Sequence, residues 1–500
     1  MSLRRHWAPA IVGASFTLLF ISACGPKGDS ALVISTPPAE GTIYSASPRA
    51  LVDLEKLGFV EKEFFLEGTA KKYKPKGEWT NDGMWDTDVA SQDKFKTRVI
   101  VRMPASPEKF NGTVLVEWLN VSRGYDSEAT FASSWPEIID SGYAWVGVSA
   151  QTMGQDALKV EKAYGPGQSN QGDAKRYASI KSPSSDGFSY DIYSQVGKAI
   201  RNQSKTLLGV DKPKHVIAMG TSQSAQRMVT YINAVHPHDN VYEAFIVHAR
   251  NAGGAPIDNI VGGDAKATIA VPSPSKFRTD LKVPVAVIES ENDAPGYFLA
   301  NQPDGPLFRV WEVTGTSHAP HARNVYQYLQ TGLPADVKVC DLPEDEMPMN
   351  YALEALISHM APWIESGQAP PSLPRLELLP DADGRGVIQR DQYGNARGGV
   401  RLPQITVPIA GYHPINSSNE ALTKLVCGLA GTTNYWTNEP KPATDLLPWT
   451  TPSLKELYPT HEAYVDAITK AANDAVAAGY LLPRDAKATI DEATNSTIGQ

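Results

Sequence analysis

The sequence predicts an α/β fold with a mostly parallel central sheet that is covered by helices on both faces. Short, nearly continuous apolar segments alternate along the chain with longer segments whose apolar residues recur at helical spacing. Strands that are apolar throughout are typical of parallel sheets, because helices bury both faces of such a sheet. A third observation is a turn of small residues between one such strand and the helix that follows it.

Several segments have the composition of buried strands. They are residues 97–104, 112–120, 143–151, 215–218, 242–250, 283–290 and 307–315. Helical spacing is found in residues 189–209, 224–235, 350–371 and 461–479, the last of which ends at a glycine. The polar stretch 152–188 and the Gly/Pro-rich stretch 251–282 leave the predicted sheet as inserted loops, and we expect them to line a substrate cleft.

Length and charge limit the possible organisation and partners. A chain of 500 residues exceeds what one hydrophobic core usually supports, so it forms one large domain with excursions or two domains. We expect an α/β core over residues 51–370 and a C-terminal extension over 371–500 that packs on it. The net charge of −9 and the absence of a Lys/Arg run argue against nucleic acid as a partner.

The N-terminal segment has the features of an export signal. Arg4 and Arg5 precede an apolar run from about Ala8 to Ile21, and "ISAC" then resembles a bacterial lipobox ending at Cys24. Residues 1–24 are therefore predicted to be a lipoprotein-type signal and residues 25–50 a flexible tether. The expected location is the bacterial cell envelope, facing the periplasm or the exterior, with membrane contact only through a lipid on Cys24. The alternative is a plain signal peptide with a chance cysteine.

Two further cysteines, Cys340 and Cys427, remain for a disulfide in an oxidising compartment. Their spacing alone does not establish that their side chains meet. Neither lies near a motif that would make it a nucleophile.

The stretch "AMGTSQSAQR" carries the first candidate catalytic residue. It places Ser222 in a Gly-x-Ser-x-small turn between the strand "HVIA" and a helix, the pattern of a nucleophile elbow. Ser224 stands where the second glycine of that pattern usually lies. The alternative interpretation is an ordinary strand-to-helix corner, because the motif alone is common.

The loops after two later strands supply an acid and a base in the order Ser, acid, His that α/β-hydrolases use. "ESENDAP" offers Asp293, which the sequence favours as the acid, with Glu291 as the alternative. "GTSHAPHA" offers His318 as the base, and His321 is expected to begin a helix or to support the site. Three loops after three predicted strands carry more weight than any one motif.

A tetrahedral intermediate also needs backbone N–H donors. The amide of Gln223, directly after Ser222, is the first candidate. The second is expected in "NVSRG", at Val121 or Ser122, and the alternative interpretation of this stretch is a plain β-turn.

An ordered series of segments extends these observations to most of the chain. It comprises "VLVEWLNVSRGYD", "GYAWVGVSAQ", "FSYDIYSQ", "GTSQSAQRM", "RVWEVTGTSHA", "WIESGQAPP" and "YGNARGGVRLP". The series resembles a bacterial and fungal family known only as alpha/beta hydrolase domain proteins, from about residue 50 to near the C-terminus. The resemblance implies an α/β-hydrolase fold, hydrolase chemistry and a catalytic place for Ser222 and His318. It implies no substrate, because fold does not fix function.

The sequence thus predicts a Ser222/His318/Asp293 hydrolase that cleaves a carboxylic ester through an acyl-enzyme. The expected partner is a small-molecule ester, and no cofactor or metal is expected, since no motif of metal-ligand spacing is present. The oligomeric state is not predicted. One alternative is an acyltransferase or lactonase that uses the same triad. Another is a non-catalytic, ligand-binding surface lipoprotein that keeps the fold without turnover.

Overall fold

The computed structural model describes residues 31–500 apart from 42, 45–46, 161–171, 259–270, 419–420 and 445–446. Leu32–Gln500 forms one compact unit. The predicted signal segment and Cys24 lie outside the described residues. Within the described part of the chain, none of the helices is both long and apolar enough to cross a bilayer.

The chain is organised around a nine-stranded sheet of order β1-β2-β3-β5-β4-β6-β7-β8-β9. The strands are β1 (Val33–Ser35), β2 (Phe59–Lys76), β3 (Asp86–Pro104), β4 (Thr113–Trp118), β5 (Ala144–Val148), β6 (His215–Thr221), β7 (Ala244–His248), β8 (Val285–Ser290) and β9 (Phe308–Val313). From β5 through β9 in sheet order, neighbouring strands run parallel. The predicted α/β fold with a mostly parallel sheet is confirmed.

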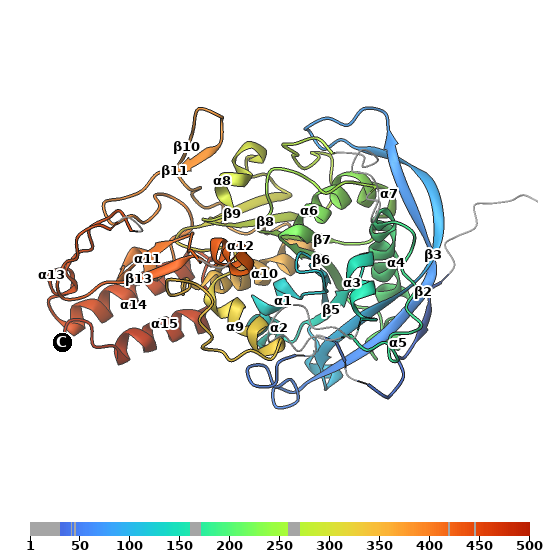
Figure 1. Cartoon of the computed structure of the whole chain (residues 1–500), viewed down its shortest axis with the longest axis horizontal. Helices are drawn as coiled ribbons and strands as arrows, with labels where there is room; N and C mark the ends of the chain where they lie inside the picture. The colour runs from blue at the N-terminus through green and yellow to red at the C-terminus, as the bar shows by residue number, and fades with distance from the viewer. Residues whose placement is uncertain are drawn as a thin grey trace, which may run out of the picture. The chain divides into compact units, whose positions relative to one another are not determined.

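An antiparallel ribbon extends this sheet at one edge, where β2 and β3 form the long blue strands of Figure 1. The predicted strand 97–104 covers only the second half of β3, and β2 lies outside the predicted strands. Strand β1 pairs with β2 through Val33–Ser35, so the prediction of a flexible tether over residues 25–50 is wrong for these residues. Pairing with β2 gives their backbone N–H and C=O groups partners within the sheet, whereas those of a free tether would bind water.

Helices bury both faces of the sheet. Those between and after the sheet strands are α1 (Ala129–Ala132), α2 (Trp135–Asp140), α3 (Thr152–Ala157), α4 (Ser189–Asn202), α5 (Ser204–Leu207), α6 (Gln223–Thr230), α7 (His236–Asp239), α8 (Ala294–Tyr297), α9 (His321–Gln330) and α10 (Met349–Ser366). On β4, Val114 and Val116 point into a core that includes side chains of α4 and α6. Leu115 lies between them and points into a second core, which includes side chains of α2 and α10. This alternation explains why the central strands are apolar on both faces over most of their length.

The C-terminal extension packs against the second of these cores. It contains β10 (Leu378–Pro380), β11 (Gly386–Ile388), α11 (Pro403–Thr406), β12 (Ala410–His413), α12 (Ala421–Ala430), β13 (Thr432–Tyr435), α13 (Leu454–Leu457), α14 (His461–Ala477) and α15 (Pro483–Asn495). Val400, Leu402 and Ile405 are buried in the same cluster as the sheet residues Ile217 and Ile288. The extension therefore belongs to the same compact unit as the core.

Candidate active site

Ser222 occupies a sharp turn between β6 and α6. Its backbone has φ 62° and ψ −119°, a conformation that L-residues rarely adopt and that costs about 1–3 kcal/mol. The turn is held because the Ser222 N–H donates to the carbonyl of His248 on β7, at 2.9 Å. A Cβ at Gly220 would come within 3.0 Å of Met228 and of the Ser224 carbonyl, so glycine is needed where strand and helix approach.

Ser224, the departure from the usual glycine, is an integral part of this turn. Its buried hydroxyl accepts a hydrogen bond from the Thr221 N–H at 3.1 Å and donates to the Thr221 carbonyl at 2.9 Å. Both bonds cross the turn that carries Ser222. A small hydroxyl side chain therefore fits the position and stabilises the bend.

His318 and Asp293 are joined by a short hydrogen bond. The His318 Nδ1 lies 2.7 Å from Asp293 Oδ1, and Ser290 Oγ donates to the other carboxylate oxygen at 2.5 Å. Burial by itself would raise the pKa of Asp293, but the adjacent His318 ring and these hydrogen bonds hold it below its ordinary value. Asp293 therefore stays ionised, as an acid that orients an imidazole must.

Glu291, the alternative acid, points to other partners. Its carboxylate accepts the Gly315 N–H at 2.7 Å and pairs with Arg390 of the extension at 2.8 Å. Gly315 lies in the turn between β9 and His318 and has φ 80°. Glu291 thus holds the backbone of the loop that carries His318, whereas Asp293 contacts the imidazole itself.

Ser222 and His318 line the same cavity, of about 220 Å³, at the carboxyl ends of the parallel strands. The other residues around it are Asn120, Ser122, Arg123, Ser127, Ala319, Arg323, Gln327, Val426 and Leu429. A larger cavity of about 460 Å³ lies at the amino ends of β8 and β9, near Val285 and Phe308, away from these two side chains.

The candidate oxyanion donors lie on two neighbouring segments. Gln223 is the first residue of α6, so its N–H is among those that a helix leaves without an intrahelical acceptor. The Ser122 N–H donates to Asn120 Oδ1 at 2.8 Å, while the Val121 N–H lies 3.5 Å from Gln223 Oε1, at the limit of a hydrogen bond. Of the two candidates for the second donor, Val121 has the less engaged N–H.

A comparison of the whole chain with models of protein families identifies its relatives. Residues 32–491 match the model described as "Alpha/beta hydrolase domain". The chain belongs to this family. No curated protein matches its sequence.

Solved structures similar to this alpha/beta hydrolase are distant in sequence. A fungal esterase from Rhizomucor miehei is 10% identical, with a TM-score of 0.34, over 65% of this chain and 93% of its own. A glucuronoyl esterase from Teredinibacter turnerae is 14% identical, with a TM-score of 0.28, over 62% of this chain and 79% of its own. A serine hydrolase without a lid, from Xanthomonas campestris, is 12% identical, with a TM-score of 0.26, over 52% of this chain and 93% of its own.

The extension of this alpha/beta hydrolase contributes one wall of the cavity. Val426 and Leu429 lie on α12, and the Leu429 carbonyl accepts the N–H of Ala319, the residue after His318, at 2.8 Å. Asp345 also holds this loop, because its carboxylate accepts the N–H of Ser317, the residue before His318, at 2.8 Å. This wall could not be predicted from the sequence, since α12 and the loop after β9 are far apart in the chain.

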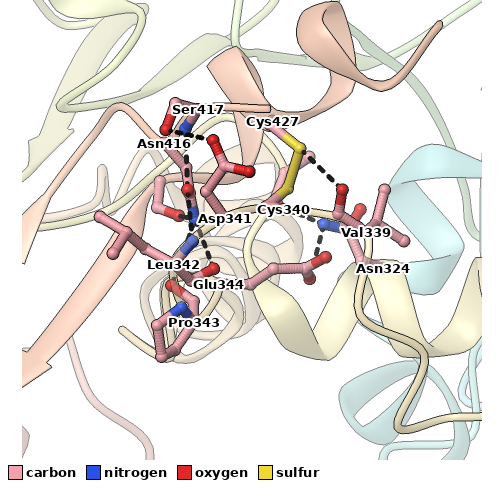
Figure 2. The surroundings of a disulfide bond; sticks show 12 residues. Asn324, Val339, Cys340, Asp341, Leu342, Pro343, Glu344, Asn416, Ser417 and Cys427 are labelled. Atoms are coloured by element: carbon pink, nitrogen blue, oxygen red, sulfur yellow. Dashed lines mark hydrogen bonds between the residues drawn. A yellow bond between two sulfur atoms is a disulfide. The ribbon is translucent and has the colours of Figure 1, made fainter. Parts of the chain in front are cut away.

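A disulfide between Cys340 and Cys427 anchors α12 (Figure 2). Cys427 lies between the two wall residues on α12. The segment that carries Cys340 is itself held at Asn416, whose Nδ2 donates to the Leu342 carbonyl at 2.9 Å, and at Glu344, which accepts Asn324 Nδ2 of α9 at 3.0 Å. The disulfide therefore fixes the wall to the helix that follows His318.

Loss of this disulfide is expected to weaken both the fold and substrate binding. The cysteines are 87 residues apart, so the disulfide closes a long loop in the unfolded chain. Reduction opens this loop and increases the entropy of the unfolded chain, which should lower the free energy of unfolding by about 3–4 kcal/mol. Because Val426 and Leu429 would be held less firmly, KM should rise more than kcat falls. Denaturant unfolding and ester kinetics of oxidised and reduced wild type, with Cys340→Ser/Cys427→Ser alongside, check this. Equal stability of the oxidised and reduced forms would contradict it.

The sequence analysis missed other residues of the site as well. Arg123 lies inside the predicted oxyanion stretch "NVSRG", but nothing in its spacing marks it as a cavity residue. Arg323 lies in the first turn of α9, and its Nη1 donates to the His318 carbonyl at 2.9 Å. His321 begins α9, as expected, and lies 3.3 Å from Glu344.

Proposed function

We propose that this alpha/beta hydrolase cleaves a carboxylic ester with Ser222 as nucleophile, His318 as general base and Asp293 as the orienting acid. The observation that carries the proposal is the position of Ser222 on a strained strand-to-helix turn, facing the same cavity as His318, whose other side bonds to Asp293. A serine hydroxyl attacks a carbonyl at neutral pH only when a neighbouring base accepts its proton.

The first half of the reaction forms an acyl-enzyme. With Nδ1–H donated to Asp293, the Nε2 lone pair of His318 takes the Ser222 proton while Oγ bonds to the ester carbonyl carbon. The N–H groups of Gln223 and Val121 stabilise the resulting oxyanion. Collapse of this intermediate breaks the bond to the alcohol oxygen, which leaves with the proton held on His318.

In the second half, water takes the place of the alcohol. His318 accepts a proton from the water as its oxygen attacks the acyl carbon, and Ser222 regains that proton as the acid departs. Acyl transfer and lactone opening need the same residues and differ only in the acceptor or in the ring that is opened. Simple hydrolysis is the function that needs no further feature of the site.

Labelling with a fluorophosphonate probe tests the nucleophile. Three serines, Ser122, Ser127 and Ser222, line the cavity, which provides matched controls. Wild type, Ser122→Ala and Ser127→Ala should be labelled and Ser222→Ala should not. Labelling of Ser222→Ala to the wild-type extent would remove Ser222 from the mechanism, and an unlabelled wild type would favour the non-catalytic alternative.

A further inference from the structure

Two arginines, Arg123 and Arg323, line the cavity together with Ser222 and His318. Arg323 is only 8% exposed, and Arg123, in the loop after β4, is half-buried. No Asp or Glu belongs to the described lining of this cavity. Two acids outside the lining, Glu117 and Asp293, also act on Arg323 and raise its pKa. Both have other partners, because Glu117 accepts two backbone N–H groups and Asp293 is engaged by His318 and Ser290. The cavity therefore carries an excess of positive charge beside the reacting groups.

Arg323 differs from the other buried arginines in what its guanidinium contacts. Five of them form ion pairs with a carboxylate: Arg98, Arg102, Arg176, Arg227 and Arg278. Arg250 forms no such pair with the residues that the structure describes, but it donates to three backbone carbonyls. The Arg323 guanidinium donates to one backbone carbonyl, that of His318. Its Nε has no hydrogen-bond partner among the described residues.

The electrostatic surroundings of Arg323 fit an anion-binding site. Burial first, and then the charge of Arg123, lower the pKa of Arg323 to about 10. Holding a second cation near a buried, unpaired guanidinium is costly unless an anion enters between them. Guanidinium groups bind carboxylates through two parallel hydrogen bonds, which gives both strength and orientation.

We propose that Arg123 and Arg323 form a carboxylate-binding subsite, so that the substrate of this enzyme is a small ester that also bears a carboxylate. The inference rests on the proposed ester hydrolysis and narrows its substrate class. The small cavity, of about 220 Å³, and its apolar wall of Val426 and Leu429 favour a short carbon chain between the ester and the carboxylate. Binding of the carboxylate orients the ester carbonyl toward Ser222.

Paired substrates test the subsite by comparing a carboxylate with a neutral primary amide of the same shape. One pair, para-nitrophenyl hemiglutarate and para-nitrophenyl glutaramate, carries the group on the acyl side. The other pair, carboxyphenyl acetate and carbamoylphenyl acetate, carries it on the leaving alcohol. In at least one pair, kcat/KM for the carboxylate should exceed that for the amide by about 10-fold at low salt. The ratio should fall as the salt concentration rises.

Variants of Arg123 connect this ratio to the subsite. Arg123→Gln should reduce the ratio by about 10-fold. Arg123→Lys keeps the charge but loses the paired N–H donors of the guanidinium, so it should reduce the ratio less. Arg385→Gln, which removes an exposed arginine on the β10–β11 hairpin, is the matched control and should leave the ratio unchanged. A ratio at or below one in both pairs, or a ratio that Arg123→Gln leaves unchanged, would overturn the proposal.

Calorimetry separates this proposal from the proposed reaction. Glutarate should bind to Ser222→Ala protein, and glutaramide should bind more weakly. If no ester is turned over by wild type but glutarate binds in an Arg123-dependent way, the subsite stands and the hydrolase assignment fails. If esters are turned over but glutarate binds no better than glutaramide, the subsite fails and the hydrolase assignment stands.

Discussion

Replacement of Asp293 with asparagine is expected to lower kcat for ester hydrolysis by about 10⁴-fold with little change in the fold. Asparagine has nearly the same shape, but it removes the ionised carboxylate that accepts His318 Nδ1–H at 2.7 Å. The imidazole then loses the partner that fixes its tautomer and stabilises its charged form. Steady-state kinetics with an activated aryl ester, together with circular dichroism, measure the effect.

Glu291→Gln is the matched control for this variant. Glu291 is on the same loop and is fully buried, and its carboxylate binds Gly315 and Arg390 instead of the imidazole. Its replacement should lower the free energy of unfolding by about 1–3 kcal/mol and reduce kcat far less than Asp293→Asn does. A larger loss of kcat in Glu291→Gln than in Asp293→Asn would reverse the assignment of the acid.

Removal of the nucleophile and removal of the base are expected to have equal and non-additive effects. Ser222→Ala and His318→Ala should each lower kcat by about 10⁶-fold, because the hydroxyl attacks only while the imidazole accepts its proton. The double variant should lose almost nothing more. Single-turnover assays on all three proteins measure these losses. Additive losses, or a loss below about 10²-fold in either single variant, would show that the two side chains do not act as a unit.

Much of the fold and the order of the candidate residues followed from the sequence because both depend on local patterns. The strand "HVIA", the turn at Ser222 and the helix after it are consecutive in the chain, so their geometry is encoded locally. The loops with Asp293 and His318 were found because each follows an apolar strand, and a parallel sheet brings the carboxyl ends of its strands to one edge.

Features that depend on distant contacts could not be predicted in the same way. Asp293 and Glu291 are two residues apart, and their different roles follow from the position of Arg390 in the extension. Strand β2 mixes charged residues with short apolar stretches such as Phe64–Leu66, so its sequence lacks the longer apolar run of the central strands. The wall on α12 exists only because this helix packs beside His318. The arginines of the cavity indicate an anion site only because its described lining contains no acid, and this is not visible in the sequence.

The identity of the covalently modified residue tests the central claim most directly. Wild-type protein is mixed with para-nitrophenyl acetate, quenched in acid during the burst phase, digested and analysed by mass spectrometry. We expect one acetyl group on the peptide that contains Ser222, and none in His318→Ala protein treated in the same way. An acetyl group carried instead by another residue, or product release without any acylated peptide, would contradict it.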